Sequence, residues 1–511
     1  MSSSGRPNIL FVLTDQHTAK VAGFAGDPWV RTEHLDALAA RSVQFDTAVC
    51  ASPVCTSSRM CLLTAKEAHR CAAWNNHWVI FPEHVTWPGH FAAHGYRTCL
   101  VGKMHLGGRD QMQGFQLRPY GDLRHGLGHQ PDPIDLFPGY AHLESAGVTE
   151  IPESLLQDVV VTRETAAFLL EHADSEPDVP WFVCASYSRP HPPLTAPGRY
   201  IRRYRDKVPV PKAPADPKER LESFARRFFQ PYSTEQTQRA LEAYYACVDF
   251  VDDCIGELLE ALQRVGLIEN TVILYTSDHG EMAGAHGLWD KCVYYDPSIC
   301  VPLLMSGSGI RAGHHRVAHP ISLMDLFPTT CALAGLPIPE GLDGVDFSRL
   351  LADPGSTVAP RQFAPSAYYR YGVRVKHLPP VGEDEPCAAM RVLRERDWKY
   401  VEIERGGPLL FDLANDPGEN VNLAGRPEHA ARCRMMREAL FRGFSWEQVH
   451  AQLTADRRRL PQLLSGQKPT TPNQYMLKDG RVFDTEGDLY GARWLSIPPE
   501  ATGGIIPQQF G

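Results

Sequence analysis

Short apolar runs that alternate with longer amphipathic segments limit the folds open to this chain more than any other feature. The runs occupy residues 8–13, 96–101, 181–186, 271–276 and 301–305. Each has the length and composition of a strand that is buried on both faces of a parallel sheet. Strands that alternate with helices predict an α/β sandwich, in which helices cover both sides of a large, mostly parallel central sheet.

The longest amphipathic segment, residues 235–265, predicts a helix that packs on one face of this sheet. Its apolar residues recur at helical spacing and include Leu241, Tyr244, Val248, Val251, Ile255, Leu258 and Leu262. A further helix is expected over residues 322–336. The Pro- and Gly-rich residues 337–360 that follow are expected to lead out of the large domain.

The length of the chain indicates a second, smaller domain, because 511 residues exceed what a single core usually carries. Residues 390–401 and 409–413 are predicted to be antiparallel strands, followed by a turn at 415–418 and a helix over 428–443. The predicted division is therefore a large α/β domain (1–360), a smaller C-terminal α+β domain (361–450) and a tail (451–511). We expect the tail to close a pocket or to join subunits.

Charge and composition exclude several classes of partner. A net charge of -9 leaves no basic surface for nucleic acid, and an acidic protein that handles anions must gather its positive charge at one site. The N-terminus lacks the pattern of a secretory signal, and no apolar run is long enough to span a membrane. Thirteen cysteines without CxxC pairs are typical of reduced thiols. We therefore expect a cytoplasmic protein without a membrane anchor.

Polar side chains follow two of the predicted strands. Asp15 and Gln16 come soon after the first apolar run, and Asp278 and His279 follow the run at 271–276. The carboxyl ends of parallel strands meet at one edge of a sheet, so these residues can surround one ligand. Oxygen and imidazole donors suit a divalent cation, although an Asp at a strand end is also common as a cap or turn residue.

A cysteine in the sequence Cys55-Thr56-Ser57-Ser58-Arg59 is the candidate nucleophile. We expect Cys55 to begin a helix that continues to Leu63, whose free N–H groups would favour negative charge. Downstream of His279, several glycines and Lys291 form a loop in which the backbone can approach an anion and the lysine adds a positive charge.

The ordered set of motifs resembles the formylglycine-dependent sulfatases of the alkaline phosphatase superfamily, over most of the chain. The matching segments are Thr14-Asp15-Gln16, Cys55 to Arg59, Lys103-Met104-His105, Arg189-Pro190-His191, Asp278-His279-Gly280 and Asn415 to Glu419. The pairing of Gln16 with His279 is more similar to the choline sulfatase, arylsulfatase and phosphonate monoester hydrolase branches than to the lysosomal one. This resemblance implies an alkaline phosphatase-like fold and the hydrolysis of aryl or alkyl sulfate monoesters with one cation, calcium or manganese.

The resemblance also implies a role for each matched residue. An activating enzyme would oxidise Cys55 to formylglycine. Residue 55 would bind the cation together with Asp15, Gln16, Asp278 and His279, and its hydroxyl, ionised by the cation, would attack sulfur. Arg59 would hold this nucleophile by hydrogen bonds. Lys103 would bind a sulfate oxygen, and His105 would deprotonate the spare hydroxyl.

Three further roles follow from the same resemblance. His191 would contact the substrate, and Lys291 would bind it and assist the leaving group. Asn76 would also reach the substrate, with Asn75 as the alternative. The partners implied are a small sulfate ester, the activating enzyme and further copies of the chain in a dimer or tetramer.

Two alternatives stay open. The same groups would stabilise an oxyanion at phosphorus, so the chain could hydrolyse phosphonate monoesters or phosphodiesters, although Lys103 with His105 favours sulfate. Ser57 stands where the family motif normally has Pro or Ala, a position that activating enzymes read. An unmodified protein would keep Cys55 as an acidic thiol and would bind anions without catalysis. The physiological substrate depends on loops such as residues 107–140 and 376–387.

Overall fold

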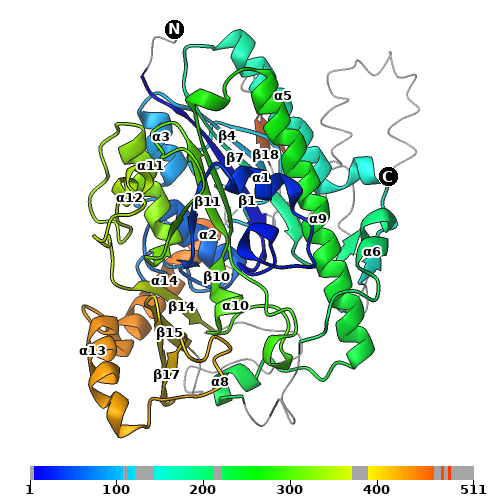
Figure 1. Cartoon of the computed structure of the whole chain (residues 1–511). Helices are drawn as coiled ribbons and strands as arrows, with labels where there is room; N and C mark the ends of the chain where they lie inside the picture. The colour runs from blue at the N-terminus through cyan, green and yellow to red at the C-terminus, as the bar shows by residue number, and fades with distance from the viewer. Residues whose placement is uncertain are drawn as a thin grey trace.

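An eight-stranded sheet forms the centre of the protein, in a computed structural model (Figure 1). The structure describes residues 5–76, 78–107, 110, 112–121, 143, 146–211, 218, 221–370, 389–464, 474–476 and 482–484. In spatial order the strands are β12 (His315–Val317), β2 (Val43–Phe45), β11 (Leu303–Gly307), β9 (Thr271–Ser277), β1 (Asn8–Asp15), β7 (Trp181–Pro190), β4 (Arg97–Gly102) and β5 (Leu117–Tyr120).

The middle of this sheet is parallel, as the apolar runs predict. Strand β1 pairs in parallel with both β7 and β9, and β4 pairs in parallel with β7 and β5. Successive residues of β1 enter opposite cores, with Phe11 on one face and Val12 on the other. Burial on both faces explains why the strand is apolar from Ile9 to Leu13 rather than alternating. The fold class predicted from the sequence is confirmed.

The prediction of a parallel strand at residues 301–305 is wrong in direction. Residues Cys300–Val301 form β10, which pairs with β3 (Ala48–Val49) in a separate small sheet completed by β13 (Ile321–Ser322). Strand β11 then runs antiparallel to β9, with Leu303 opposite Thr276. Between β9 and β11 the chain forms a loop and the short helix α10 (Asp296–Ile299), without the crossover helix that typically connects parallel strands.

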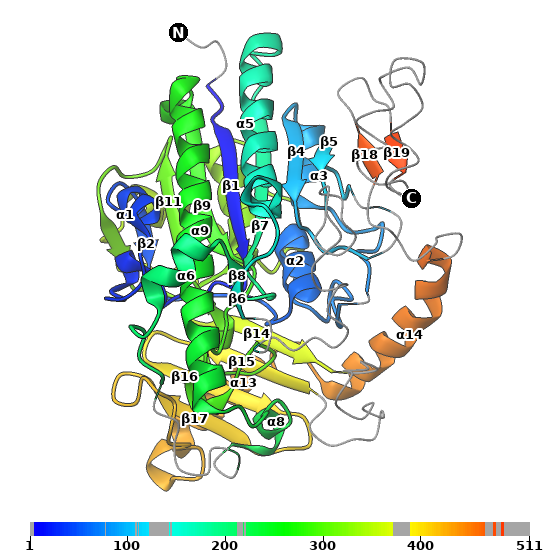
Figure 2. The ribbon, with the colours of Figure 1, turned by 90° about the vertical axis from the view of Figure 1, so that its right-hand side faces the viewer.

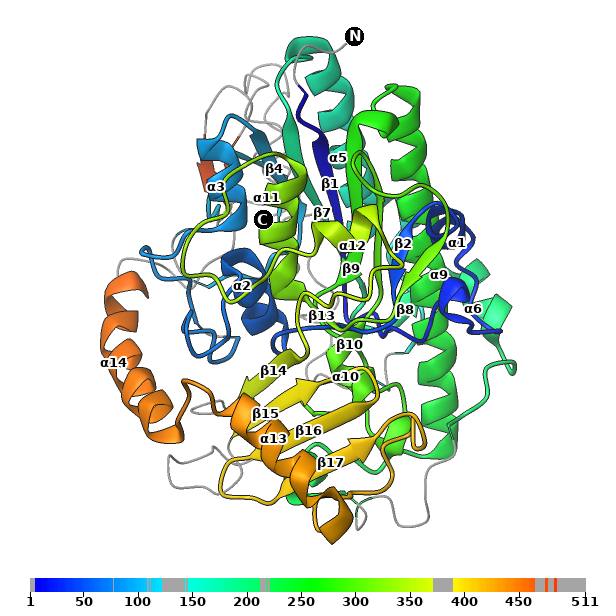
Figure 3. The same cartoon turned by 60° about the vertical axis from the view of Figure 1, so that its left-hand side comes forward.

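Helices cover both faces of the central sheet. One face carries α1 (Glu33–Ala39), α5 (Gln157–Ser175), α6 (Gly198–Tyr204) and α9 (Thr234–Arg264), which cross the sheet in Figure 2. The opposite face carries α2 (Cys55–Thr64), α3 (Trp87–Ala93), α11 (Leu326–Leu333) and α12 (Ser348–Ala352), seen in Figure 3. Helix α9 matches the amphipathic segment predicted at 235–265, and a capping box between Ser233 and Gln236 sets its first turn. The helix expected over 322–336 is shorter, because Leu323–Asp325 form a 3-10 turn.

A four-stranded antiparallel sheet lies beyond the central one, at the bottom of Figure 3. Its strands are β14 (Ala364–Tyr369), β15 (Ala389–Arg394), β16 (Trp398–Ile403) and β17 (Pro408–Asp412), with α13 (Ala430–Leu440) beside β15 and β16. Residues 390–401, predicted as one strand, instead belong to a hairpin, because the chain turns where the Glu395 N–H donates to the Trp398 carbonyl. A pattern of apolar residues does not mark so tight a turn.

Buried charges join this sheet to the loop that follows β9. The fully buried Lys399 Nζ lies 2.8 Å from Asp296 Oδ1 in α10 and also contacts Glu419. Arg394 pairs with the same Asp296 at 3.0 Å. Because Asp296 follows the loop after β9, these pairs attach that loop to the second sheet.

The remaining elements are short, apart from one C-terminal helix. They are β6 (Gly147–Val148), β8 (Thr195–Ala196), α8 (Ser223–Arg226), α14 (Trp446–Leu464), β18 (Gln474–Met476) and β19 (Val482–Asp484). Helix α14 crosses the boundary expected at residue 450, and most of the tail lies outside the described residues; the three-part division stays a prediction. None of the helices in the described residues combines the length and apolar character that crossing a membrane requires.

Candidate active site

Four side chains that are distant in sequence meet at the carboxyl edge of the central sheet. Asp15 is the last residue of β1, Asp278 and His279 directly follow β9, and Cys55 is the first residue of α2. Cys55 Sγ lies 3.1 Å from His279 Nε2 and 3.8 Å from Asp15 Oδ1. One ligand atom from each of the four lies within 4.8 Å of the others, and all four side chains are buried. The structure therefore brings together the strand ends and the cysteine.

This cluster fits a divalent cation by the chemistry of its donors. Two carboxylates and an imidazole supply the oxygen and nitrogen ligands that divalent cations accept. Burial raises the pKa of Asp278, with Arg59 opposing the shift. Despite burial, Asp278 and Cys55 raise the pKa of His279 to about 9. Buried carboxylates have lost their hydration, and a nearby cation stabilises their negative charge. Asp15, Asp278 and His279 would hold such a cation.

Gln16, the fifth predicted metal ligand, lies beside the cluster in a constrained conformation. Its φ of 67° is rare for a residue other than glycine. Two bonds hold this backbone: the Gln16 N–H donates to Asp278 Oδ1 at 3.1 Å, and Tyr244 Oη donates to the Gln16 carbonyl at 2.8 Å. The side-chain oxygen accepts from Lys291, and the side-chain nitrogen donates to Glu281.

Arg59 lies beside the two carboxylates of the cluster. Within the described residues its guanidinium contacts Asp278 Oδ2 at 2.8 Å and Asp15 Oδ2 at 3.0 Å, and also bonds to the Lys103 carbonyl and Ser186 Oγ, rather than to the Cys55 side chain. Arg59 thus holds the two carboxylates, and a hydrogen bond from Arg59 to the oxidised form of residue 55 stays a prediction. The physical reason is that two buried carboxylates attract a buried guanidinium more strongly than a thiol does.

Basic side chains surround Cys55. Lys103 Nζ lies 2.6 Å from Asp15 Oδ2, and His191 Nε2 lies 4.0 Å from Asp15 Oδ1. His105 is close enough to Cys55 to favour the ionised form of its thiol and so to lower its pKa. Although burial opposes ionisation, Lys291, Lys103 and His279 lower the pKa of Cys55 well below its ordinary value. The local concentration of positive charge that an acidic protein needs for anion binding is therefore at residue 55.

Two of these basic residues leave their strands at sharp turns. Lys103 follows Gly102, whose φ is 95° and where a Cβ would lie 2.1 Å from the Ser186 carbonyl, so no other residue fits. His191 follows β7, and its Nδ1 lies 2.6 Å from the Pro192 carbonyl. Burial, with Lys103 and Lys291, lowers the pKa of His191 to about 3. His191 is therefore neutral near pH 7, with Nδ1 as the donor and Nε2 facing the site.

Asn76 contacts the helix that carries the nucleophile. Its Oδ1 accepts a hydrogen bond from the Thr56 N–H at 3.0 Å. The amide thereby satisfies one of the free N–H groups in the first turn of α2, where Val54 supplies no side-chain cap. Contact between Asn76 and a substrate stays a prediction.

The two serines of the motif do not cap the helix as short polar residues commonly do. Ser58 Oγ donates to the Asp278 carbonyl at 2.5 Å and ties α2 to the end of β9. Ser57 is buried, and its hydroxyl has no hydrogen-bond partner within the described residues. A proline or alanine, which the family motif normally has at this position, carries no such hydroxyl.

Glu281 is a functional candidate that the sequence interpretation did not assign. It is buried, and burial together with Asp290 raises its pKa to about 7. The feature of the sequence that could have indicated Glu281 is its place two positions after His279, within the glycine-rich loop. Its partner Gln16 is far away in sequence, so only the fold reveals the contact.

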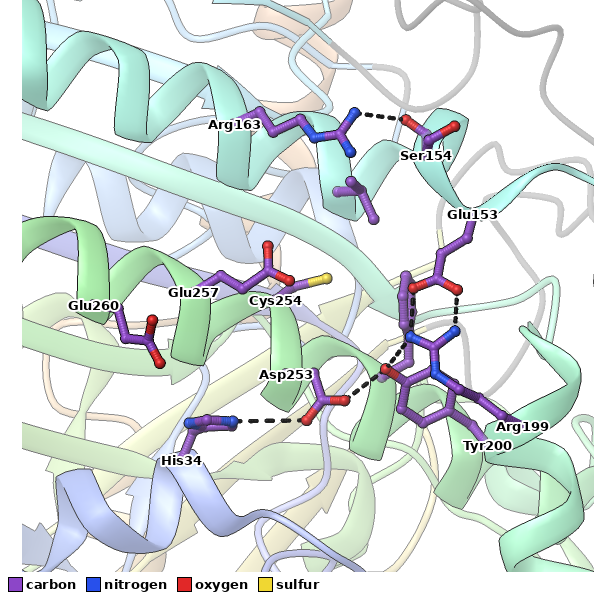
Figure 4. A pocket seen from close by; sticks show the side chains of 12 residues that line it. His34, Glu153, Ser154, Arg163, Arg199, Tyr200, Asp253, Cys254, Glu257 and Glu260 are labelled. Atoms are coloured by element: carbon purple, nitrogen blue, oxygen red, sulfur yellow. Dashed lines mark hydrogen bonds and ion pairs between the residues drawn. The ribbon is translucent and has the colours of Figure 1, made fainter.

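A separate pocket of about 470 Å³ lies between α5, α6 and α9 (Figure 4). Its charged groups largely pair with one another: Arg199 with Glu153, and Tyr200 Oη with Asp253. His34, at its rim, forms a second group of possible metal ligands with Asp252 and Asp253. None of the residues predicted to act in catalysis lines this pocket. The loops at 107–140 and 376–387, expected to wall the substrate site, lie mostly outside the described residues.

The fold and the site together define the class of protein: an α/β protein in which a buried cysteine lies between a candidate cation cluster and basic side chains. Comparison with protein families identifies it more closely, because the model described as sulfatase matches residues 7–336 and that of the N-sulphoglucosamine sulphohydrolase C-terminal region matches residues 284–443. The chain therefore belongs to the sulfatase family and is a sulfuric ester hydrolase.

Curated relatives agree with this assignment. The chain is 31% identical to an ulvan-active sulfatase of Formosa agariphila over 435 residues, covering 83% of this chain and 78% of the relative. It is 30% identical to a choline-sulfatase of Rhizobium meliloti over 447 residues, covering 83% and 84%. The match thus extends over most of both chains.

Solved structures share the fold. The phosphonate monoester hydrolase of Agrobacterium radiobacter has a TM-score of 0.71 at 22% identity, covering 93% of this chain and 99% of that one. BT4656, solved with its substrate D-glucosamine-2-N,6-O-disulfate, has a TM-score of 0.69 at 20% identity, covering 88% and 98%. At these identities the likeness concerns the fold alone.

Proposed function

We propose that this protein hydrolyses aryl or alkyl sulfate monoesters to an alcohol and sulfate, with formylglycine formed from Cys55 as the nucleophile and one divalent cation. The observation that carries the proposal is the position of Cys55. It begins α2 and faces Asp15, Asp278 and His279, while Lys103, His105, His191 and Lys291 lie around it. A nucleophile between a cation site and positive side chains suits attack on a dianionic or monoanionic ester.

Each side chain has a task that follows from its place. A bound cation would lower the pKa of a hydroxyl at residue 55 and draw charge from the ester. Lys103 and Lys291 offer positive charge to the oxygens of the ester, in a buried site where such charge acts strongly. His191 presents a neutral Nε2 toward the substrate, and His105 accepts a proton at residue 55. Arg59 keeps Asp15 and Asp278 fixed before substrate arrives.

A comparison of reaction rates tests the proposed activity. With aryl sulfate and aryl phosphonate esters that share one leaving group, we expect the sulfate ester to give the larger kcat/KM, because Lys103 and His105 match the sulfate arrangement. A preference for the phosphonate ester would favour a phosphonate monoester hydrolase. Mass spectrometry of the peptide containing Cys55 decides the remaining alternative: an unmodified cysteine together with no turnover would indicate an anion-binding protein.

Cation binding gives a second prediction. We expect one calcium or manganese ion per chain, bound at the Asp15 and Asp278 cluster, measured by isothermal titration calorimetry and by metal analysis. Asp278→Asn should weaken cation binding by at least about 100-fold. Removing a residue that only supports a metal ligand already costs up to about 100-fold in affinity, and Asp278 is itself a proposed ligand.

The control uses the other possible metal group. His34→Ala removes the imidazole beside Asp252 and Asp253 but leaves the strand ends intact. We expect this variant to bind one cation with unchanged affinity. If His34→Ala loses the ion and Asp278→Asn retains it, the cation binds beside Asp252 and Asp253, and the proposed mechanism is contradicted.

We also propose the wider setting of the protein. A cytoplasmic location is supported by the cysteines, since every cysteine in the described part of the chain is a free thiol. An activating enzyme would convert Cys55, and the tail would join subunits into a dimer or tetramer. Size-exclusion chromatography with light scattering measures the last point directly.

A further inference from the structure

Glu281 links both sides of the loop that follows β9. Its Oε1 accepts hydrogen bonds from the Ala283 N–H at 2.9 Å and from the Asp290 N–H at 2.6 Å. The Met282 N–H donates to the Asp290 carbonyl at 2.8 Å across the same loop. The loop is thereby closed immediately before Lys291, so the position of this lysine depends on the Glu281 carboxylate.

The second oxygen of Glu281 faces a different part of the chain. Its Oε2 accepts a hydrogen bond from Gln16 Nε2, and Gln16 Oε1 accepts one from Lys291. An amide has a donor side and an acceptor side, whereas a carboxylate only accepts and an ammonium group only donates. Glu281 and Lys291 therefore require the same orientation of the Gln16 amide. Its nitrogen points to Glu281 and its oxygen points to the side where Lys291 lies.

This orientation matters because only the amide oxygen can bind a cation. Hydrogen bonds with Asp278 and Tyr244 hold the backbone of Gln16. The side-chain amide is therefore the part of the residue that remains to be oriented. A rotation of the amide by half a turn would present an N–H₂ group to the cation site. Partners of this kind, behind a ligand, commonly decide ligand orientation and affinity.

We propose that Glu281 is a positioning residue that orients the Gln16 amide, so that Gln16 Oε1 faces the cation site and Lys291 is held at its edge. The inference rests on the proposed function, since it takes the cation to bind at the Asp15 and Asp278 cluster. In this role Glu281 acts through Gln16 and Lys291.

The test exchanges donor and acceptor. In Glu281→Gln the amide oxygen is needed to accept from the Ala283 and Asp290 N–H groups, so the N–H₂ group lies against the N–H₂ group of Gln16. We expect manganese affinity to fall by about 10–100-fold. The double variant Gln16→Glu with Glu281→Gln restores a donor–acceptor pair with the same net charge, and we expect it to recover most of the affinity. The single variant Gln16→Glu sets two carboxylates face to face, so we expect it to bind less tightly than the double variant. Titration calorimetry on the purified full-length chain measures all four proteins.

A matched control is available in the second sheet. Glu419 is also a buried carboxylate, whose pKa burial raises to about 7, and it contacts Lys399 rather than the site. Glu419→Gln removes the same charge, so we expect a lower melting temperature but unchanged manganese affinity.

The outcomes separate the two proposals. If the wild-type protein binds no cation, the proposed function is overturned. If the wild type binds manganese but Glu281→Gln binds equally well, or Gln16→Glu binds as tightly as the double variant, the positioning role is overturned. Should Glu281→Gln fail to fold, the comparison of Gln16→Glu with the double variant decides. A manganese affinity that is higher in the double variant than in either single variant supports the inference.

Discussion

Cys55→Ala is expected to lower kcat/KM for an aryl sulfate by at least about 10⁴-fold, on the scale of losses seen when an enzymatic nucleophile is removed. Cys55 is buried at the start of α2, among the basic residues that would bind the ester. Steady-state kinetics on the purified variant measures the effect. The variant should still bind the cation, because Asp15, Asp278 and His279 remain.

Cys61→Ala is the matched control. Cys61 lies in the same helix, is also buried, and contacts Cys71 rather than the cation cluster. We expect this change to leave kcat/KM within about threefold, and to cost stability of about 1 kcal/mol for the lost side-chain volume. An unchanged rate in Cys55→Ala would remove Cys55 from the mechanism. An equal loss in both variants would point to damage of α2 instead.

Arg59→Met is expected to lower the free energy of unfolding by about 3–5 kcal/mol, the range measured when one partner of a buried ion pair is removed. Arg59, Asp15 and Asp278 are all fully buried, so the substitution removes the guanidinium that the two carboxylates share and leaves Lys103 beside Asp15. Urea unfolding monitored by fluorescence and circular dichroism measures the loss. A saturating divalent cation should recover part of it, since the cation binds the folded state and supplies the missing positive charge.

An exposed arginine provides the comparison. Arg264 pairs with Glu260 on the surface of α9 at 3.0 Å. Arg264→Ala should change the free energy of unfolding by no more than about 0.5 kcal/mol, with or without added cation. A loss below about 1 kcal/mol in Arg59→Met would mean that the two carboxylates are neutral or solvated, contrary to the arrangement described here.

The sequence predicts the central strands well because each is defined locally. Residues 9–13 and 272–275 carry uninterrupted apolar or aromatic side chains, and the polar residues that follow them mark the edge of the sheet. Helix α2 is also predicted locally, from the apolar residues Met60 to Leu63 that follow Cys55. Directions and turns were harder: residues 301–305 have the composition of a parallel strand but pair antiparallel with β9, and residues 390–401 contain a hairpin.

The chain by itself determined which chemical groups stand at the strand ends, and in which order they occur. Asp15, Gln16, Asp278 and His279 follow apolar runs whose burial requires no knowledge of distant residues. Only the tertiary structure decided which partners these groups have. Arg59 binds the carboxylates of Asp15 and Asp278, and Glu281 faces Gln16. Such contacts join residues from different elements, and their geometry depends on packing across the whole sheet rather than on the local pattern that periodicity records.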